Sequence, residues 1–449
     1  ETIPFYVEGF IHSIEEAKAD LEKYAVKEEE KQEEKEEKEE KKTEEKEEKF
    51  ILVAVSTSNE KETKSSLDEL EELVYTAGAK SVGRLVQNRE RIHAVTYLGK
   101  GKLEELKEML LYMEADGVLC DDELSPAQLR NLERILDTKI VDRTMLILDI
   151  FAKRASTGEG KIQVELAQLK YAAVRLVGLR SSLSRLGGGI GTRGPGEKKI
   201  ELDRRLIHNR ISVLKEELRE VKKQRDIRRK ARKDNFVIAI VGYTNAGKST
   251  FLNKLTGADV LAEDKLFATL DPTTRKLKLP SGNEVLLTDT VGFIRKLPHH
   301  LIEAFKSTLE EAKYADLIVH MIDASNPEAD TQMLIVYNTL RELGIEDKEV
   351  VSLYNKIDVM PEDTILPRDF HAEHTLKISA KTGEGLEEFK ELVDKILRQQ
   401  RIYLEKLIPY KDSAKLALIR KHGELELEDY REDGIYIKAM VPTNIYDLL

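Results

Sequence analysis

Hydrophobic positions between residues 50 and 141 follow two alternating patterns. Short apolar runs, which predict buried strands, lie at 51–55, 81–86, 117–120 and 140–141. Stretches with apolar residues at helical spacing lie between them, at 64–75, at 102–113 and after Pro126. Strands that alternate with helices at this spacing indicate a parallel sheet covered by helices.

A heptad-like pattern follows in two stretches on either side of a glycine-rich loop. In both stretches the apolar positions are spaced alternately four and three residues apart, at Ile162, Leu166, Leu169, Ala173 and Leu176 and at Ile207, Ile211, Leu214, Leu218 and Val221. A narrow apolar stripe of this kind predicts two helices that pack along a shared seam. We therefore expect an antiparallel helical hairpin, whose arms of about 25 residues would each be roughly 37 Å long.

Beyond residue 235 the pattern again predicts strands and helices, in two groups. The first group has apolar strands at 236–241, 284–288 and 349–354. The second group has strands at 402–408, 425–430 and 434–441 and a helix at 413–422. A short run of strands with one helix predicts a small α+β domain at the end of the chain.

Composition excludes several classes of protein. The chain has 449 residues, of which 41% are hydrophobic, and this is enough for several separate cores. Its single cysteine, Cys120, can form neither a disulfide within the chain nor a cysteine-rich zinc site, and we expect it to be buried. No apolar run approaches the roughly 20 residues that span a bilayer, and the N-terminus lacks the layout of a signal peptide. We therefore expect a cytoplasmic protein without a membrane span.

Charge is distributed unevenly along the chain. The net charge is -11, yet residues 170–233 contain 20 Lys and Arg against 7 Asp and Glu. Such a concentrated basic stretch is typical of a nucleic-acid contact, and a solvated charged helix is the alternative. Residues 27–49, in contrast, contain almost only Lys and Glu, so they can bury nothing and are interpreted as a spacer.

The loop at 186–197, between the two predicted arms, contains six glycines among twelve residues. A flexible hinge is one interpretation of it, but basic side chains crowd around the loop. Exposed backbone amides beside arginines suit close contact with phosphates, so we favour insertion into structured RNA. The residues expected to contact RNA are Arg185, Gly188, Gly189, Arg193, Gly194, Lys198 and Lys199.

The strongest motif is GYTNAGKS at 242–249, which follows an apolar strand and matches G-x-x-x-x-G-K-[ST]. In this motif, backbone amides and a helix N-terminus bind the nucleotide phosphates. Lys248 is expected to neutralise the β and γ phosphates, and the Ser249 hydroxyl to bind Mg²⁺. The residues of this loop expected to hold the nucleotide are Gly242, Asn245, Ala246, Gly247, Lys248, Ser249 and Thr250.

Two further motifs indicate that the nucleotide is GTP or GDP. NKID at 355–358 follows a predicted strand, and its carboxylate, Asp358, can accept from two N–H groups of guanine that adenine does not offer together. SAK at 379–381 is placed to support the base. The expected guanine-binding residues are Asn355, Lys356, Asp358, Ser379, Ala380 and Lys381.

A fourth motif, DTVG at 289–292, is expected to respond to the γ phosphate. Asp289 would reach Mg²⁺ through water, and the Gly292 amide would hold the γ phosphate. The preceding segment 266–275 must supply a threonine to the metal, and Thr273 and Thr274 are both candidates, with Thr274 preferred. The expected metal ligands are therefore Ser249, Thr274 and Asp289, and the expected catalytic residues are Lys248, Thr273, Thr274 and Gly292.

Phe293 stands where Ras-type proteins place a glutamine that orients the attacking water. An aromatic ring can neither donate a hydrogen bond nor accept a proton in this role. We therefore expect slow hydrolysis by the isolated protein and acceleration by a bound partner.

Two features of the N-terminal unit have simpler interpretations than a ligand site. Gly99-Lys100-Gly101 is expected to be a turn that leads into a helix rather than a phosphate site. Asp121-Asp122-Glu123 is expected to supply capping charge for the helix near Ser125 rather than a metal site.

Together these patterns predict an α/β protein in five parts. Residues 1–49 form an extension with a Lys/Glu-rich, low-complexity spacer, and the other four parts are folded. They are an N-terminal parallel α/β domain at 50–153, a long antiparallel helical hairpin at 154–234, a Ras-like P-loop G domain at 235–398 and a small C-terminal α+β domain at 399–449.

From about residue 50 to the C-terminus the chain resembles the HflX family of translational GTPases. The resemblance rests on the glycine loop joined to this P-loop, that is, on 187–197, Asp203-Arg204-Arg205, 242–250, 266–275 and 289–294. It implies a factor that binds the 50S ribosomal subunit and the 70S ribosome and splits stalled ribosomes, notably after heat stress, with GTP hydrolysis releasing the factor. We expect the protein to be a monomer.

The resemblance also implies finer contacts. The hairpin tip would approach 23S rRNA at the peptidyl transferase centre, and Asn245 matches the position at which related GTPases bind K⁺. An ATP activity attributed to the N-terminal domain of this family would fall near 99–102. Two other functions remain open: a non-catalytic RNA-binding or ribosome hibernation module, and a ribosome-assembly GTPase.

Overall fold

The computed structural model describes residues 47–183, 195–230, 235–257, 265–297 and 309–442, apart from short gaps at 58, 310, 346, 362–363, 365 and 400, together with residue 446. Predictions for residues 1–46 and for the loop residues Arg185, Gly188, Gly189, Arg193 and Gly194 lie outside the described residues. Lys198 and Lys199 lie in a described helix, but their side chains are outside the description.

The N-terminal unit is a four-stranded parallel sheet in the order β2-β1-β3-β4. Its strands are β1 (Lys49–Ser56), β2 (Lys80–Asn88), β3 (Gly117–Cys120) and β4 (Lys139–Asp142), and its helices are α2 (Glu60–Ala77), α3 (Lys100–Tyr112), α4 (Pro126–Leu136) and α5 (Arg143–Arg154). Alternate residues of β1 pack on opposite faces, with Leu52 in one apolar cluster and Val53 in the other. The predicted parallel sheet is confirmed, whereas α5 was not predicted.

The local features of this unit agree with the sequence analysis in part. Gly99 precedes α3 as its N-cap, as expected for a turn into a helix, and Cys120 is buried. The capping role expected for Asp121-Asp122-Glu123 is wrong, because Ser125 and Gln128 form a reciprocal capping box at the start of α4. Asp121 instead binds basic side chains.

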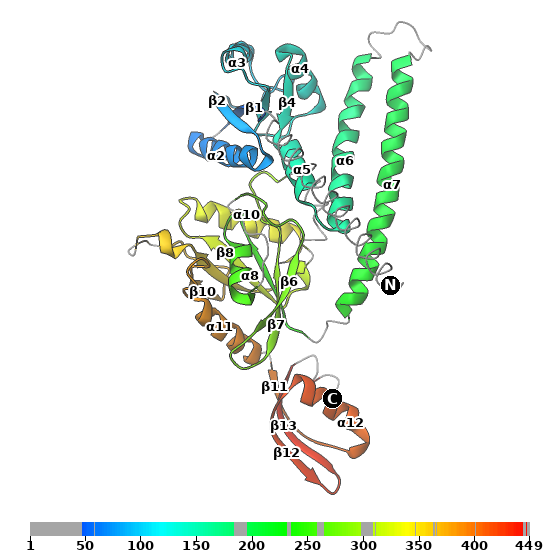
Figure 1. Ribbon diagram of the computed structural model, residues 1–449, viewed down its shortest axis with the longest axis vertical. Coiled ribbons are helices and arrows are strands. Elements are labelled where there is room, and N and C mark those ends of the chain that lie inside the picture. Colours follow the sequence, from blue (N-terminus) through cyan, green and yellow to red (C-terminus); the bar gives the residue numbers. More distant parts are fainter. Residues whose placement is uncertain are drawn as a thin grey trace, which may run out of the picture.

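The predicted hairpin consists of α6 (Gly158–Leu183) and α7 (Pro195–Lys230), which lie side by side along their length (Figure 1). Residues of both heptad-like stretches form a buried seam, namely Leu166, Ala173, Ile211 and Leu214. Helix α6 also packs on α4 and α5, and Arg175 forms an ion pair with Asp142 at the end of β4, with 2.8 Å between Nη2 and Oδ2. Helix α6 is thus fixed to the N-terminal domain between about Val164 and Arg175.

A six-stranded sheet in the order β10-β9-β8-β5-β7-β6 follows, antiparallel only at its β6 edge. Its elements are β5 (Val237–Gly242), α8 (Lys248–Thr256), β6 (Thr273–Lys278), β7 (Glu284–Asp289), β8 (Leu317–Asp323), α10 (Ala329–Glu342), β9 (Glu349–Asn355), β10 (His374–Lys377) and α11 (Leu386–Gln399), with a short 3₁₀ helix η1 (Ile357–Val359). The parallel strands β5, β7 and β9 end at Gly242, Asp289 and Asn355. Carboxyl ends of parallel strands share one edge of a sheet, so three of the sequence motifs meet there.

The C-terminal unit is a three-stranded antiparallel sheet in the order β11-β13-β12 (Figure 1). It contains β11 (Arg401–Ile408), a 3₁₀ helix η2 (Tyr410–Asp412), α12 (Ser413–His422), β12 (Glu424–Arg431) and β13 (Gly434–Pro442), in agreement with the sequence analysis. Ile419 of α12 packs on Ile437 and Ala439 in a small closed core. Within the described residues, no helix has both the length and the apolar content that crossing a bilayer requires.

Candidate nucleotide-binding site

The loop from Gly242 to Lys248 makes a tight turn between β5 and α8. Gly247 has a φ of 94° at the N-cap of α8, and a Cβ atom there would lie 2.2 Å from Nδ2 of Asn355. Only glycine fits this position, because a side chain would collide with Asn355 and would not favour the left-handed backbone. The Asn355 amide donates to the Ala246 carbonyl over 2.8 Å, so the guanine motif holds the phosphate loop in place.

Lys248 begins α8 and is buried. Its ammonium group donates to two backbone carbonyls of the same loop, that of Tyr243 at 2.8 Å and that of Gly242 at 3.3 Å. Burial lowers the pKa of Lys248 to about 8, although the nearby Asp289 carboxylate opposes this effect. A charge held in a poorly solvated place is ready to pair with a phosphate, which would restore the charged form.

Asp289, at the end of β7, meets two hydroxyl groups. Its Oδ2 accepts from Ser249 at 2.7 Å and from Thr269 at 3.1 Å, and these two hydroxyls lie 2.7 Å apart. Its Oδ1 is buried without a hydrogen-bond partner, and burial raises the pKa of this carboxyl despite the opposing charge of Lys248. Three oxygens and an unpaired buried carboxylate oxygen form a donor set that suits Mg²⁺, a hard cation.

Thr269 was missed by the sequence analysis, which considered Thr273 and Thr274. Both of those residues lie in β6, and the Thr274 hydroxyl bonds to Thr288 at 2.9 Å within the β6–β7 pair. The geometry therefore favours Thr269 over Thr274 as the threonine of the metal site. The signal available in the sequence is that Thr269 lies between apolar residues, which anchor a segment, whereas Thr273 and Thr274 begin a strand-like alternation.

The residues after Asp289 pair with the phosphate loop. Phe293 donates its backbone N–H to Gly242 at 3.1 Å, and its carbonyl accepts from Thr244 at 2.7 Å. Gly292 approaches so closely that a Cβ atom there would lie 2.7 Å from the Thr244 Cα and 3.0 Å from the Lys248 Nζ. The Phe293 side chain is buried, so it presents no group that could orient a water.

The guanine motifs meet on the other side of the phosphate loop. Asn355 accepts from the Ala380 amide at 2.8 Å, and Ser379 donates to the Asp358 carboxylate at 2.7 Å. Lys356, with a φ of 68°, forms an ion pair of 2.7 Å with Asp323. Lys381 is exposed in the turn that follows. The structure thus brings the two motifs together with Asp358 exposed towards the surface.

A cavity of about 50 Å³ lies over the phosphate loop. Its lining comes from the phosphate loop, from the start of α8 and from the two segments that are expected to respond to the γ phosphate, which we call the switch segments (265–269 and 290–292). The lining residues are Thr244, Asn245, Gly247, Lys248, Ser249, Thr250, Lys265, Phe267, Ala268, Thr269, Thr290 and Gly292.

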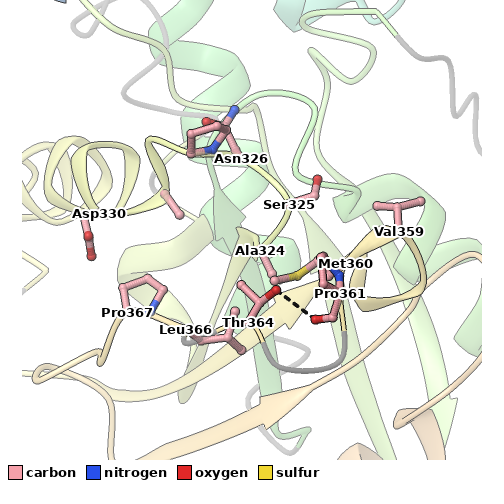
Figure 2. A pocket seen from close by; sticks show the side chains of 12 residues that line it. Ala324, Ser325, Asn326, Asp330, Val359, Met360, Pro361, Thr364, Leu366 and Pro367 are labelled. Atoms are coloured by element: carbon pink, nitrogen blue, oxygen red, sulfur yellow. Dashed lines mark hydrogen bonds between the residues drawn. The ribbon is translucent and has the colours of Figure 1, made fainter.

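A larger cavity, of about 490 Å³, lies beside the guanine motif (Figure 2). Its walls come from the segment after β8 and the segment after η1, including Ala324, Met360 and Leu366. Among the residues that line it, Asp330 is the one with a charged side chain. An acidic and apolar lining does not suit a phosphate, so this cavity is not a second nucleotide site.

Side chains beside the phosphate loop and after Gly292 also bind the N-terminal domain. Lys296 forms ion pairs with Asp122, at 2.7 Å, and with the buried Asp121. Asp121 is in turn paired with Arg143 at 2.8 Å. The Tyr243 hydroxyl in the phosphate loop bonds to Glu69 of α2. The edge of the N-terminal sheet therefore lies directly against the segment that is expected to sense the γ phosphate.

Profiles of three families match successive parts of the chain: one described as GTP-binding GTPase N-terminal at 64–152, one described as GTP-binding GTPase Middle Region at 154–232, and one described as 50S ribosome-binding GTPase at 237–356.

Two relatives are similar over most of their length. The GTPase HflX of Lacrimispora saccharolytica is 65% identical over 89% of this chain and 94% of its own, and that of Caldanaerobacter subterraneus is 53% identical over 89% of this chain and 92% of its own. A solved structure of a GTP-binding protein from Sulfolobus solfataricus in complex with GDP is 26% identical, with a TM-score of 0.42, and covers 78% of this chain and 98% of that chain.

The two threonine assignments can be separated by substitution. Thr269→Ala removes a hydroxyl beside Ser249 and Asp289, and we expect it to weaken Mg²⁺-dependent binding of a non-hydrolysable GTP analogue by about tenfold or more. Thr274→Ala removes a hydroxyl that bonds Thr288, and binding should change less than about twofold. Fluorescence titration of the analogue at several Mg²⁺ concentrations measures both, and the reverse ranking would contradict the assignment.

Nucleotide affinity should depend on pH through Lys248. The phosphates bind the protonated amine, whose pKa without nucleotide is about 8, so above pH 8 binding must take up a proton. We expect the Kd for GDP to be flat from pH 6.5 to 7.5 and to rise towards about tenfold per pH unit above pH 8. Calorimetry in two buffers of different ionisation enthalpy would detect the uptake of protons, and a constant Kd up to pH 9 would exclude this pKa.

Proposed function

The chain belongs to the HflX family of GTPases, and from this premise we propose that it binds the 50S subunit and the 70S ribosome and splits stalled ribosomes when loaded with GTP. Its enzymatic activity is the hydrolysis of GTP. Hydrolysis would then release the protein from the 50S subunit. The observation that carries this proposal is a basic hairpin of two long helices. The start of its first helix, residues 156–164, which we call the hairpin root, packs against the nucleotide-binding domain.

We assign the GTP site to the residues whose geometry is described above. Lys248 and the amides of the phosphate loop bind the phosphates, while Asn355 and Asp358 select guanine. Ser249 and Asp289, with Thr269 in place of Thr274, would hold Mg²⁺, which neutralises charge on the β and γ phosphates when bound. We further propose that Asn245 is the position for a K⁺ ion.

Basic residues of the hairpin provide the proposed contact with ribosomal RNA. In the described part of α7, exposed arginines and lysines such as Arg219 and Lys223 make ion pairs with glutamates one turn away, so they are partly neutralised. The two tip arginines belong to the glycine-rich loop instead: Arg185 directly precedes residues 186–197, and Arg193 is followed by Gly194. We therefore assign the direct contact with 23S rRNA near the peptidyl transferase centre to the tip.

Stimulation by the ribosome follows from the side chain at 293. A buried phenylalanine leaves the site without its own water-orienting residue, so a partner must provide that group or order the switch segments. We therefore expect the rate of GTP turnover to rise severalfold or more when 50S subunits are added. The increase must be caused by the 50S subunits themselves.

Splitting itself is tested by sedimenting 70S ribosomes in sucrose gradients with the protein and GTP, GDP or a non-hydrolysable GTP analogue. We expect the subunit peaks to grow with GTP and the analogue and not with GDP. Binding without splitting and without stimulated turnover would indicate a hibernation module instead. Stimulated turnover with intact 70S particles would indicate an assembly GTPase.

The tip is tested by Arg193→Ala. Loss of one phosphate contact should weaken 50S binding and reduce the slope of log K against log salt by about 1, while GDP affinity stays the same. Arg219→Ala, which removes an arginine of the same charge from the exposed side of α7, is the matched control. An equal effect of both substitutions would mean that general charge, and not the tip, governs binding.

A further inference from the structure

The segment 266–271, which carries Thr269, is held between the phosphate loop and the root of the hairpin. Three of its residues, Leu266, Phe267 and Leu270, are buried in an apolar cluster that includes Phe151 and Ala155 at the end of α5 and Val164 of α6. The rings of Phe267 and Phe151 meet edge to face with their centroids 4.6 Å apart. The same segment therefore contacts the hairpin root on one side and the Ser249–Asp289 pair on the other.

Asp271, at the end of this segment, binds the two residues that precede α6, and one of them, Thr157, caps the helix by accepting from the Gly160 N–H at 2.9 Å. Its Oδ2 accepts from the backbone N–H groups of Ser156 and Thr157, at 3.0 and 2.9 Å, and from the Ser156 hydroxyl at 2.7 Å. Its Oδ1 accepts from the Thr157 hydroxyl at 2.5 Å. One carboxylate thus binds the backbone N–H and the hydroxyl of both Ser156 and Thr157, and it holds in place the residue, Thr157, that caps the helix.

The close fit around this carboxylate depends on a glycine and on a charge. A Cβ atom at Gly160 would lie 2.3 Å from Oδ1 of Asp271, so a larger residue would push the carboxylate away. Burial alone would raise the pKa of Asp271, but the hydrogen bonds from Thr157 and Ser156 outweigh it and lower the pKa. The group is therefore ionised at neutral pH, where a negative charge at a helix N-terminus is favourable.

Thr269 and Asp271 are separated by one residue, so their Cα atoms can be at most about 7 Å apart. Leu270 between them is buried. This short, anchored stretch joins the first turn of α6 to the hydroxyl beside Asp289, and little slack is available between the two ends.

We propose that Asp271 is a positioning residue for GTP hydrolysis: by holding Thr157, the residue that caps α6, it fixes Thr269 beside Ser249 and Asp289, and it thereby couples the nucleotide site to the hairpin root. The coupling is reciprocal, because a nucleotide that draws Thr269 towards its γ phosphate changes the cap by the same free energy with which the cap changes nucleotide affinity. The proposal rests on the GTPase activity alone and does not require ribosome splitting.

The test uses the full chain and substitutes a residue that does not line the phosphate cavity. Thr157→Ala removes one bond to Asp271 together with the cap on the Gly160 N–H, and Ser125→Ala removes the corresponding N-cap of α4 as the matched control. Thr157→Ala should weaken binding of a fluorescent non-hydrolysable GTP analogue in Mg²⁺ by about fivefold, the loss typical of a helix cap, with GDP affinity within about twofold. Ser125→Ala should leave both affinities unchanged.

Hydrogen exchange provides a readout that does not depend on turnover. We expect the amides of the first turn of α6 to exchange at different rates with the analogue and with GDP, and Asp271→Asn to abolish this difference. Equal loss of analogue and GDP affinity in Thr157→Ala, or an effect as large in Ser125→Ala, would overturn the proposal, because either result indicates general destabilisation.

A double-mutant cycle decides whether the effect passes through Thr269. With Thr269→Ala already present, Thr157→Ala should cause no further loss of analogue affinity, whereas additive losses would show that the cap acts by another route. If Asp271→Asn does not fold, Thr157→Ala takes its place in the exchange experiment and should abolish the same difference, and Thr157→Ser, which keeps the hydroxyl, is the conservative control. Native affinity in Thr157→Ser supports the proposal, and a fivefold loss in it contradicts the role of the hydrogen bond.

Discussion

The nucleotide site depends on the parallel pairing of the central strands of the six-stranded sheet. Because β5, β7 and β9 run in the same direction, Gly242, Asp289 and Asn355 all end at one edge. Short loops then bring together groups that are more than 100 residues apart, as the bond from Asn355 to Ala246 shows. A slip of one residue in β7 would turn Asp289 to the other face of the sheet and remove the carboxylate from Ser249 and Thr269.

The N-terminal sheet repeats this arrangement but uses it for contact between domains. Asp121 directly follows β3 and Asp142 ends β4, so two carboxylates lie at the edge where an open α/β sheet ordinarily binds a ligand. Here Asp121 forms ion pairs with Arg143 and Lys296, and Asp142 forms an ion pair with Arg175 of the hairpin. Buried carboxylates must be paired, so these cations hold the three units in a fixed arrangement.

Much of the fold could be predicted from the sequence, because periodicity reports local burial. The parallel strands, the seam of the hairpin and the C-terminal sheet all follow from the spacing of apolar residues. Helix α5 could not be found in this way, since it begins directly after β4 with no turn between them and Asp142 serves as both strand end and cap. To choose between Thr269 and Thr274, one must know at which residue β6 begins. The spacing of apolar residues defines such a boundary poorly. The contact of Asp271 with Ser156 and Thr157 joins residues 115 and 114 positions apart and has no local signal in the sequence.

Because α6 is long, a small movement at its capped end can produce a much larger movement at its other end. The helix has 26 residues, so it is about 39 Å long, roughly seven times the 5.4 Å of its first turn. Arg175 ties α6 to the N-terminal sheet, so a tilt of α6 about Gly158 carries that sheet with it, and a shift of about 0.5 Å at one turn from Gly158 becomes about 3.5 Å at the far end. A displacement at the first turn of α6 no larger than thermal motion would thus produce, at the far end of the helix, a displacement comparable to the spacing of stacked bases.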